Sequence, residues 1–251
     1  MHRVLFAGIQ LFLPVAALAA NFALEPTRLE LDAKHQAAII TISNKSAQPL
    51  HLQIETMRWT SDTEGVWNLQ PTDDLIVNPQ LFEIAGGSDS ALRVGTLQLA
   101  DGVERAYRII IEELPEENPG TAPDKVTIHM LTNISVPIFV ESVKAQPVLA
   151  INTARIQGRH LIVNFTNNGN ARVDPHQLTI HILDNKHGEI FHKEQLFGYV
   201  LSESGLTLEL DLPTPVCAQA TSFTVQLESM PAFPEHDIRK GADACAVTSS
   251  P

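Results

Sequence analysis

The segment from Lys125 to Val140 constrains the fold of this chain more than any other part of the sequence. Every second residue from Val126 onward falls on one face, and six of the seven residues on that face are apolar. They are Val126, Ile128, Met130, Thr132, Ile134, Val136 and Ile138. This period of two predicts a strand about twice the ordinary length. A small domain rarely covers so long an apolar face by itself. We therefore expect the first half of the strand to protrude as an unpaired, apolar edge to which another polypeptide can bind.

The composition indicates a globular chain of one large or two modest domains. It has 251 residues, of which 44% are hydrophobic and 18% are charged. The formal charge of −12 comes without any cluster of Lys and Arg. A net negative field disfavours nucleic acids and anionic membranes, and we expect neither as a partner.

Residues 1–20 have the pattern of a secretory signal. Arg3 supplies a positive start, residues 4–15 are apolar, and Ala17-Leu18-Ala19 forms a small-x-small cleavage site. A membrane anchor is the alternative, but the run is short for a bilayer span and Pro14 suits a processing site. We expect cleavage near Ala19 or Ala20, export of the mature chain, and no membrane insertion.

Two cysteines, Cys217 and Cys245, are the complete set in the chain. In an oxidising compartment such a pair predicts one disulfide, which closes a loop of about 28 residues and stabilises by roughly 3–4 kcal/mol on the chain-entropy estimate. Two free thiols are the alternative. A catalytic or metal role is disfavoured because there is no CxxC pattern and no histidine nearby at ligand spacing.

The rest of the chain is a series of short predicted strands separated by turn-forming residues, without a convincing amphipathic helix. The strands expected in the first domain are 22–31, 37–43, 50–59, 75–77, 90–97, 105–113 and 125–140. Those expected in the second are 149–156, 160–167, 177–183, 189–196, 206–212 and 223–227. A hinge at 142–148 separates a domain at 21–142 from a domain at 143–251, and the last twenty or so residues are polar and expected to be loosely held. The fold class is therefore all-β, with two immunoglobulin-like sandwiches joined by a short hinge.

Motifs of catalysis and cofactor binding are missing from the sequence. There is no GxSxG, HExxH or phosphate-binding loop, and no pair of carboxylates in a plausible frame. Three histidines, His181, His187 and His192, share one expected hairpin but lack a ligand pattern. We expect no enzyme activity, no metal and no cofactor.

Four short motifs, in order, resemble the PapD-like periplasmic pilus chaperones. The first runs through residues 77–87, with Pro79, Phe82 and Gly86-Gly87, and leads to Arg93-Val94. The second is the strand at 104–115, ERAYRIIIEELP. The other two lie in the second domain, at 167–170 and 198–201. The sequence of residues 107–115, YRIIIEELP, and the proline at 137 resemble those of the archaic branch of the family, which serves Csu-type and spore-coat-type pili.

The resemblance implies a mechanism that agrees with the long strand. A pilus subunit is an incomplete sandwich, and a chaperone of this family inserts its long strand into the open groove until an outer-membrane usher takes the subunit. By alignment the inserted side chains would be Ile128, Met130 and Thr132, extended by Val126 and Ile134. The alternative is that the whole face packs on the chain's own core, which we favour for Val136 and Ile138. The family also implies a periplasmic location.

A basic pair that grips the subunit's terminal carboxylate is the family's second feature. Arg28 aligns with the first-strand arginine, and a guanidinium can hold a carboxylate through two parallel bonds. The family's partner lysine is missing, because Pro137 stands at its place. Arg93 is the substitute that we expect, with Arg108 as a weaker candidate.

Two other functions are weighed against a chaperone. A structural pilus subunit or adhesin would carry a spare donor extension, whereas residues 21–31 run directly into the first expected strand. A carbohydrate-binding module would need more exposed aromatic residues than two Trp and two Tyr supply. The uncovered edge of the long strand could also pair with a second copy in the free protein, which would give a self-capping dimer.

Overall fold

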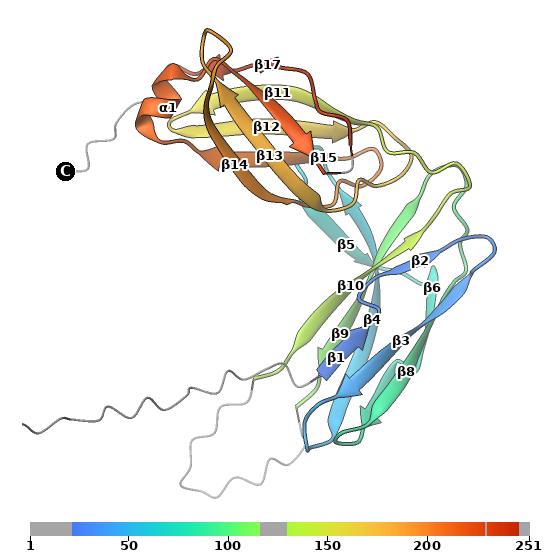
Figure 1. Ribbon diagram of the computed structural model, residues 1–251. Coiled ribbons are helices and arrows are strands. Elements are labelled where there is room, and N and C mark those ends of the chain that lie inside the picture. The colour runs from blue at the N-terminus through green and yellow to red at the C-terminus, as the bar shows by residue number, and fades with distance from the viewer. Residues whose placement is uncertain (1–21, 116–129, 229, 246–251) are drawn as a thin grey trace, which may run out of the picture.

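The computed structural model of the protein describes residues 22–115, 130–228 and 230–245. They form two β-sandwiches set at an angle to each other, the first coloured blue to green and the second yellow to red (Figure 1). The expected all-β class with two immunoglobulin-like domains is therefore confirmed. The expected signal at 1–20 lies outside the described residues. No helix in the described ranges is long and apolar enough to cross a membrane.

The first sandwich packs a four-stranded sheet on a six-stranded sheet. The four-stranded sheet has the order β1 (Phe22–Glu25), β3 (Ala37–Asn44), β8 (Asp89–Thr96) and β6 (Leu75–Asn78). The other has the order β2 (Leu29–Leu31), β10 (Asn133–Val140), β9 (Arg105–Glu113), β4 (Leu50–Ser61) and β5 (Trp67–Pro71), and β7 (Leu81–Ile84) pairs with the start of β4. Alternate residues of both sheets, such as Ile42 and Ile109, are fully buried between them.

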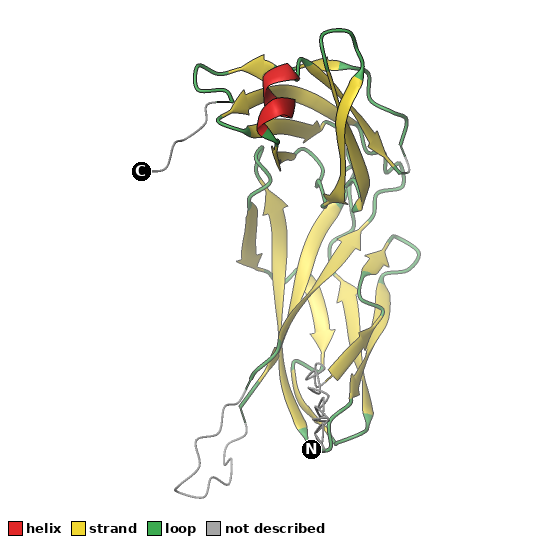
Figure 2. Cartoon of the chain, turned by 60° about the vertical axis from the view of Figure 1, so that its left-hand side comes forward, coloured by secondary structure: helices red, strands yellow, loops and turns green. Residues whose placement is uncertain are grey.

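The second sandwich has two four-stranded sheets. One has the order β15 (Gly205–Asp211), β12 (His160–Asn167), β11 (Leu149–Gln157) and β18 (Arg239–Lys240). The other has the order β14 (Glu189–Phe197), β13 (His176–Leu183), β16 (Ser222–Leu227) and β17 (His236–Asp237). A single short helix in the described part, α1 (Thr214–Gln219), is the red element of Figure 2.

The strand expected at 22–31 is in fact two strands in two different sheets. β1 pairs antiparallel with β3, whereas β2 pairs in parallel with the end of β10. Pro26 lies between them, and a proline has no N–H to continue a ladder. The chain thus changes sheets at this point, which sequence periodicity alone could not reveal.

A buried asparagine fixes the same kind of corner in each sandwich. Asn44, at the end of β3, donates from Nδ2 to the carbonyls of Gln48, Ile84 and Ala85 at 2.8, 3.0 and 3.3 Å. Asn167, at the end of β12, donates in the same way to Ala171, Val200 and Leu201 at 2.7, 3.1 and 3.1 Å. Each amide therefore holds the carbonyl four residues ahead and two consecutive carbonyls of a distant segment.

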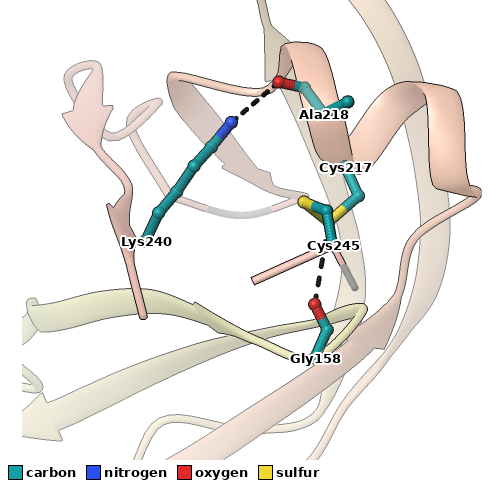
Figure 3. The surroundings of a disulfide bond; sticks show 5 residues. All are labelled: Gly158, Cys217, Ala218, Lys240 and Cys245. Atoms are coloured by element: carbon teal, nitrogen blue, oxygen red, sulfur yellow. Dashed lines mark hydrogen bonds between the residues drawn. A yellow bond between two sulfur atoms is a disulfide. The ribbon is translucent and has the colours of Figure 1, made fainter. Parts of the chain in front are cut away.

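The C-terminal segment completes the second sandwich. β17 pairs with β16 and β18 pairs with β11, so that two-residue strands end both sheets on one side. The expected disulfide between Cys217 and Cys245 is confirmed, and Cys245 N–H also donates to the Gly158 carbonyl at 2.6 Å (Figure 3). Lys240 Nζ donates to the Ala218 carbonyl at 2.9 Å. The segment up to residue 245 is therefore bound to both sheets, more firmly than the expected loose tail.

The tip of the β4–β5 hairpin joins the first sandwich to the second. Backbone N–H groups of Gly205 and Thr207, at the start of β15, donate to the carbonyls of Asp62 and Glu64 at 2.9 and 3.0 Å. A Cβ atom at residue 205 would lie 2.0 Å from the Thr63 carbonyl oxygen, so this approach requires glycine. The two domains are thus hydrogen-bonded away from the hinge.

Candidate functional site

The first half of β10 is an open edge of the six-stranded sheet. β9 pairs with the whole of β10, but β2 pairs only with Ile138, Phe139 and Val140. Along residues 133–137 the described part of the chain supplies no strand on the other side. The main-chain groups that face outward there are those that a further strand would need.

Along the apolar face of this segment, the side chains go from exposed at Met130 to fully buried at Ile138. The side chain of Met130 is 74% exposed, Ile134 is partly buried against the core, and Val136 and Ile138 are enclosed. Thr132 extends the ladder, since Glu113 N–H donates to its carbonyl at 2.9 Å. Of the five residues expected to enter a subunit, Val126 and Ile128 lie outside the described residues. The other three are on the part of the face that is not fully buried.

Arg28 lies between β1 and β2 and is already engaged with acids. Its guanidinium is 3.1 Å from a Glu30 carboxylate oxygen and 3.3 Å from an oxygen of Asp174, a residue of the second domain. Burial alone would lower the pKa of Arg28, but hydrogen bonding to Tyr199 and the charges of both acids leave that pKa raised. Arg28 therefore has a structural role at the domain boundary, whatever else it binds.

A buried arginine that the sequence did not single out holds the two domains together. Arg172 is 8% exposed, and its guanidinium faces four carboxylates. These are Glu104, Asp174 at 2.8 Å, Glu30 at 2.5 Å and Glu141 at 3.5 Å. Burial raises the pKa of Glu104 even though Arg172 opposes the shift. Arg172 and Asp174 are two residues apart, but Glu30, Glu104 and Glu141 come from three other segments, so no local pattern could have predicted the cluster.

Arg108 on β9 is a second buried arginine, with a different environment. It lies directly across from Pro137 of β10, the position where the family resemblance leads one to expect a lysine. Its guanidinium carbon is 4.0 Å from the ring centroid of Trp59 and 4.1 Å from that of Trp67. Nη1 donates to Ser135 Oγ at 3.1 Å. Among the described residues no carboxylate lies within ion-pairing distance of Arg108, which is 6% exposed.

Aromatic residues from both domains meet beside Arg108. The ring of Tyr199, from the second domain, lies 5.5 Å from Trp59 and 5.4 Å from Phe139 by ring centroid. Leu201 packs into the same small cluster. Burial lowers the pKa of Arg108, with Tyr199 acting in the opposite direction. Tyr199 influences the pKa of both Arg28 and Arg108, so both arginines lie near this residue of the second domain. We call the region of Arg28, Arg108, Trp59 and Tyr199 at the domain boundary the cleft.

Arg93 is not part of this cleft. It is an exposed residue of β8, in the other sheet of the first sandwich, and its neighbours in register are Ile39 and Asn78. Of the three arginines expected as anchors, the structure brings Arg28 and Arg108 together and leaves Arg93 apart.

The histidines of the second domain do not form a metal site. His181 and His192 each bond to a carboxylate oxygen of Glu189, at 2.8 and 2.9 Å, and His187 bonds to Glu235. Within the described ranges no group of three or more His, Cys, Asp or Glu side chains could hold a metal ion. These pairs are contacts of an exposed hairpin.

The fold defines a two-domain protein of immunoglobulin-like sandwiches, and comparison with known proteins gives its family. Residues 21–143 match the family described as pili and flagellar-assembly chaperone, PapD N-terminal domain. The first domain of the chain therefore belongs to this family of PapD-like pilus chaperones. A search of curated protein sequences found no match.

Solved structures of pilus chaperones share the fold. A chain of the CsuC–CsuE chaperone–tip subunit pre-assembly complex, from archaic Csu pili of Acinetobacter baumannii, is 22% identical, with a TM-score of 0.57 over 88% of this chain and 100% of that chain. The YadV chaperone is 13% identical, with a TM-score of 0.57 over 86% and 99%. A chain of the SafA pilin–SafB chaperone complex of Salmonella enterica is 16% identical, with a TM-score of 0.53 over 88% and 96%. At these identities the likeness establishes the fold.

Proposed function

We propose that this chain is a periplasmic chaperone of the archaic chaperone–usher type, which captures pilus subunits by donating the strand that contains residues 126–134. The observation that carries the proposal is the open edge of β10 together with the exposed Met130 that precedes it. A strand that is paired on one side only can complete another protein's sheet through main-chain hydrogen bonds. Its alternate side chains, Met130 and Ile134 among them, would fill the hydrophobic groove of an incomplete sandwich.

The energy available from such insertion suits a complex that must later be released. Four inserted apolar side chains contribute roughly 6–12 kcal/mol before the costs of association. Main-chain hydrogen bonds would fix the register of the inserted strand, and they depend little on the client's sequence. Delivery to an outer-membrane usher would follow, because a competing strand can displace the chaperone one residue pair at a time.

For the subunit's terminal carboxylate, we propose Arg108 as the principal anchor. The register places it across from Pro137, so a cation from the neighbouring strand stands where the family's lysine would be. Arg28 lies in the same cleft but is paired with Glu30 and Asp174, which reduces its ability to attract a further carboxylate. We therefore assign Arg28 a supporting part and leave Arg93 out.

Substitutions on the two faces of the donor segment test strand donation. Met130→Asp places a charge on the inserted face, whereas Leu131→Asp places the same charge on an exposed residue of the other face. The chain is co-expressed with the small exported subunit encoded nearest its gene, and the captured subunit is quantified after purification. We expect Met130→Asp, like Ile128→Asp, to abolish capture without unfolding the chaperone, and Leu131→Asp to retain most of it.

Equal capture by Met130→Asp and the unsubstituted chain would contradict strand donation through this face. Size-exclusion chromatography of the chain purified alone distinguishes a chaperone from the alternative, a structural pilus subunit. A fibre subunit would polymerise, whereas a chaperone would remain a monomer or a capped dimer.

A further inference from the structure

Arg108 stands apart from the other buried charges in the described part of the chain. The buried charged residues there are Glu104, Arg108 and Arg172, and the first and last of them pair with each other. Enclosing an unpaired charge is costly, and proteins ordinarily place an opposite charge beside it. Here two tryptophans take that place.

The two rings support the guanidinium from one side. The Trp59 and Trp67 centroids are 4.7 Å apart at an interplanar angle of 61°, and each is about 4 Å from the guanidinium carbon. Rings on opposite faces of the guanidinium would be nearly twice as far apart. The rings therefore form a V, and the guanidinium lies across its opening.

This support leaves hydrogen-bond donors of Arg108 unused. Nη1 bonds to Ser135, whereas Nε is enclosed and has no partner within the described residues. Nη2 makes no hydrogen bond to a described residue, so its donors are the ones left for a ligand. A tryptophan face attracts a cation but takes none of its N–H donors, unlike a carboxylate partner.

We infer that Trp59 and Trp67 hold Arg108 as a deliberately unpaired cation, and that Trp67 is a positioning residue for the client's terminal carboxylate. This inference rests on the proposed function and adds to it the groups that keep the anchor available. An acidic neighbour would stabilise Arg108 equally well, but it would compete with the incoming carboxylate.

Trp67 is the better of the two tryptophans to test. Trp59 is 2% exposed and packs with Tyr199 and Phe139 between the domains, so its removal would disturb the whole cleft. Trp67 is 50% exposed on the edge strand β5. Replacing it removes one of the two rings that contact Arg108, at little cost to the core.

The experiment compares capture of two forms of one client, the small exported subunit encoded nearest the gene. One form has its natural C-terminus, and the other carries two added glycines that displace the carboxylate. We expect the unsubstituted chaperone to prefer the natural form, and Arg108→Ala to lose the preference. Trp67→Leu should reduce it by roughly two- to thirtyfold, the range of a single cation–π contact. Trp67→Phe should restore most of it.

A second readout needs no client. In protein labelled with ¹⁵N-arginine, the Nε–H signal of Arg108 should be shifted by the tryptophan rings and exchange slowly with water. Trp67→Leu should reduce the shift and speed exchange, whereas the signal of exposed Arg93 should not change. These effects should appear while the melting temperature stays constant.

The outcomes separate this inference from the proposed function. If Trp67→Leu keeps the full preference while Arg108→Ala loses it, the positioning role is wrong and the anchor stands. If Arg108→Ala also keeps the preference, the anchor and the inference are both wrong. Strand donation stands or fails separately, on Met130→Asp.

Discussion

Asn167 illustrates how one residue can set the geometry of a domain boundary. Its Oδ1 accepts the backbone N–H of Val148, in the segment that joins the domains, and that of Gly169, while Nδ2 serves three carbonyls. The side chain is fully buried. Losing it would leave several enclosed polar groups without partners.

We therefore predict that Asn167→Ala lowers the free energy of unfolding by about 2–4 kcal/mol. Chemical denaturation followed by circular dichroism measures the change. Asn68→Ala, at an exposed position of β5, is the control and should alter stability by less than about 0.5 kcal/mol. A similar small effect at Asn167 would show that the corner is held by other contacts.

At the residue scale, the sequence predicted individual residues of the site better than the contacts between them. Pro137 was identified as a departure from the family, and Arg108 as a weaker candidate to replace the lysine. Their direct opposition depends on the register of β9 and β10, which no local pattern contains. Arg172 was missed because three of its four acids, Glu30, Glu104 and Glu141, lie far from it in the chain.

At the element scale, long alternating strands were predicted to within a few residues. The strands at 105–113 and 160–167 have the expected bounds. β5 was missed although its residues, WNLQP, alternate between apolar and polar, because the run has only five residues and ends in a proline. The described part of the long strand begins at Asn133, and the predicted start at 125 lies outside the described residues.

The hairpin that contains β5 gives a prediction at this scale. Gly205→Ala should displace the hairpin tip, because the new Cβ would meet a backbone carbonyl, and we expect a loss of about 1–3 kcal/mol of stability. Hydrogen exchange of the Thr207 amide, which donates to Glu64, should quicken. Gly198→Ala is the matched control, since nothing lies within 4 Å of a Cβ there. Unchanged exchange at Thr207 would contradict a hairpin that braces the domains.

At the scale of the whole molecule, the two sandwiches are stabilised in different ways. The first relies on its core and on the cleft, and it contains both tryptophans. The second adds a covalent link that spans 28 residues and fixes the segment carrying β17 and β18. The all-β class, the two domains and the disulfide were all predicted, because they depend on composition, period and cysteine number and not on register.

Removal of the disulfide should therefore affect mainly the second domain. We predict that the double variant Cys217→Ser, Cys245→Ser loses about 3–4 kcal/mol. Circular dichroism should record the earlier unfolding of the second domain, while tryptophan fluorescence reports the first domain unfolding close to its original midpoint. A loss below about 1 kcal/mol would mean that β17 and β18 hold the segment without the bond.

The pairing of β17 and β18 with the two sheets has a consequence for edge-to-edge association with other polypeptides. On that flank, β18 pairs with residues 155–156 of β11 and β17 pairs with residues 222–223 of β16, so a foreign strand would have to displace these short strands to pair along the whole edge. Residues 133–137 of β10 have no such cover in the described part of the chain. The two edges therefore differ in how readily a further strand can add to them.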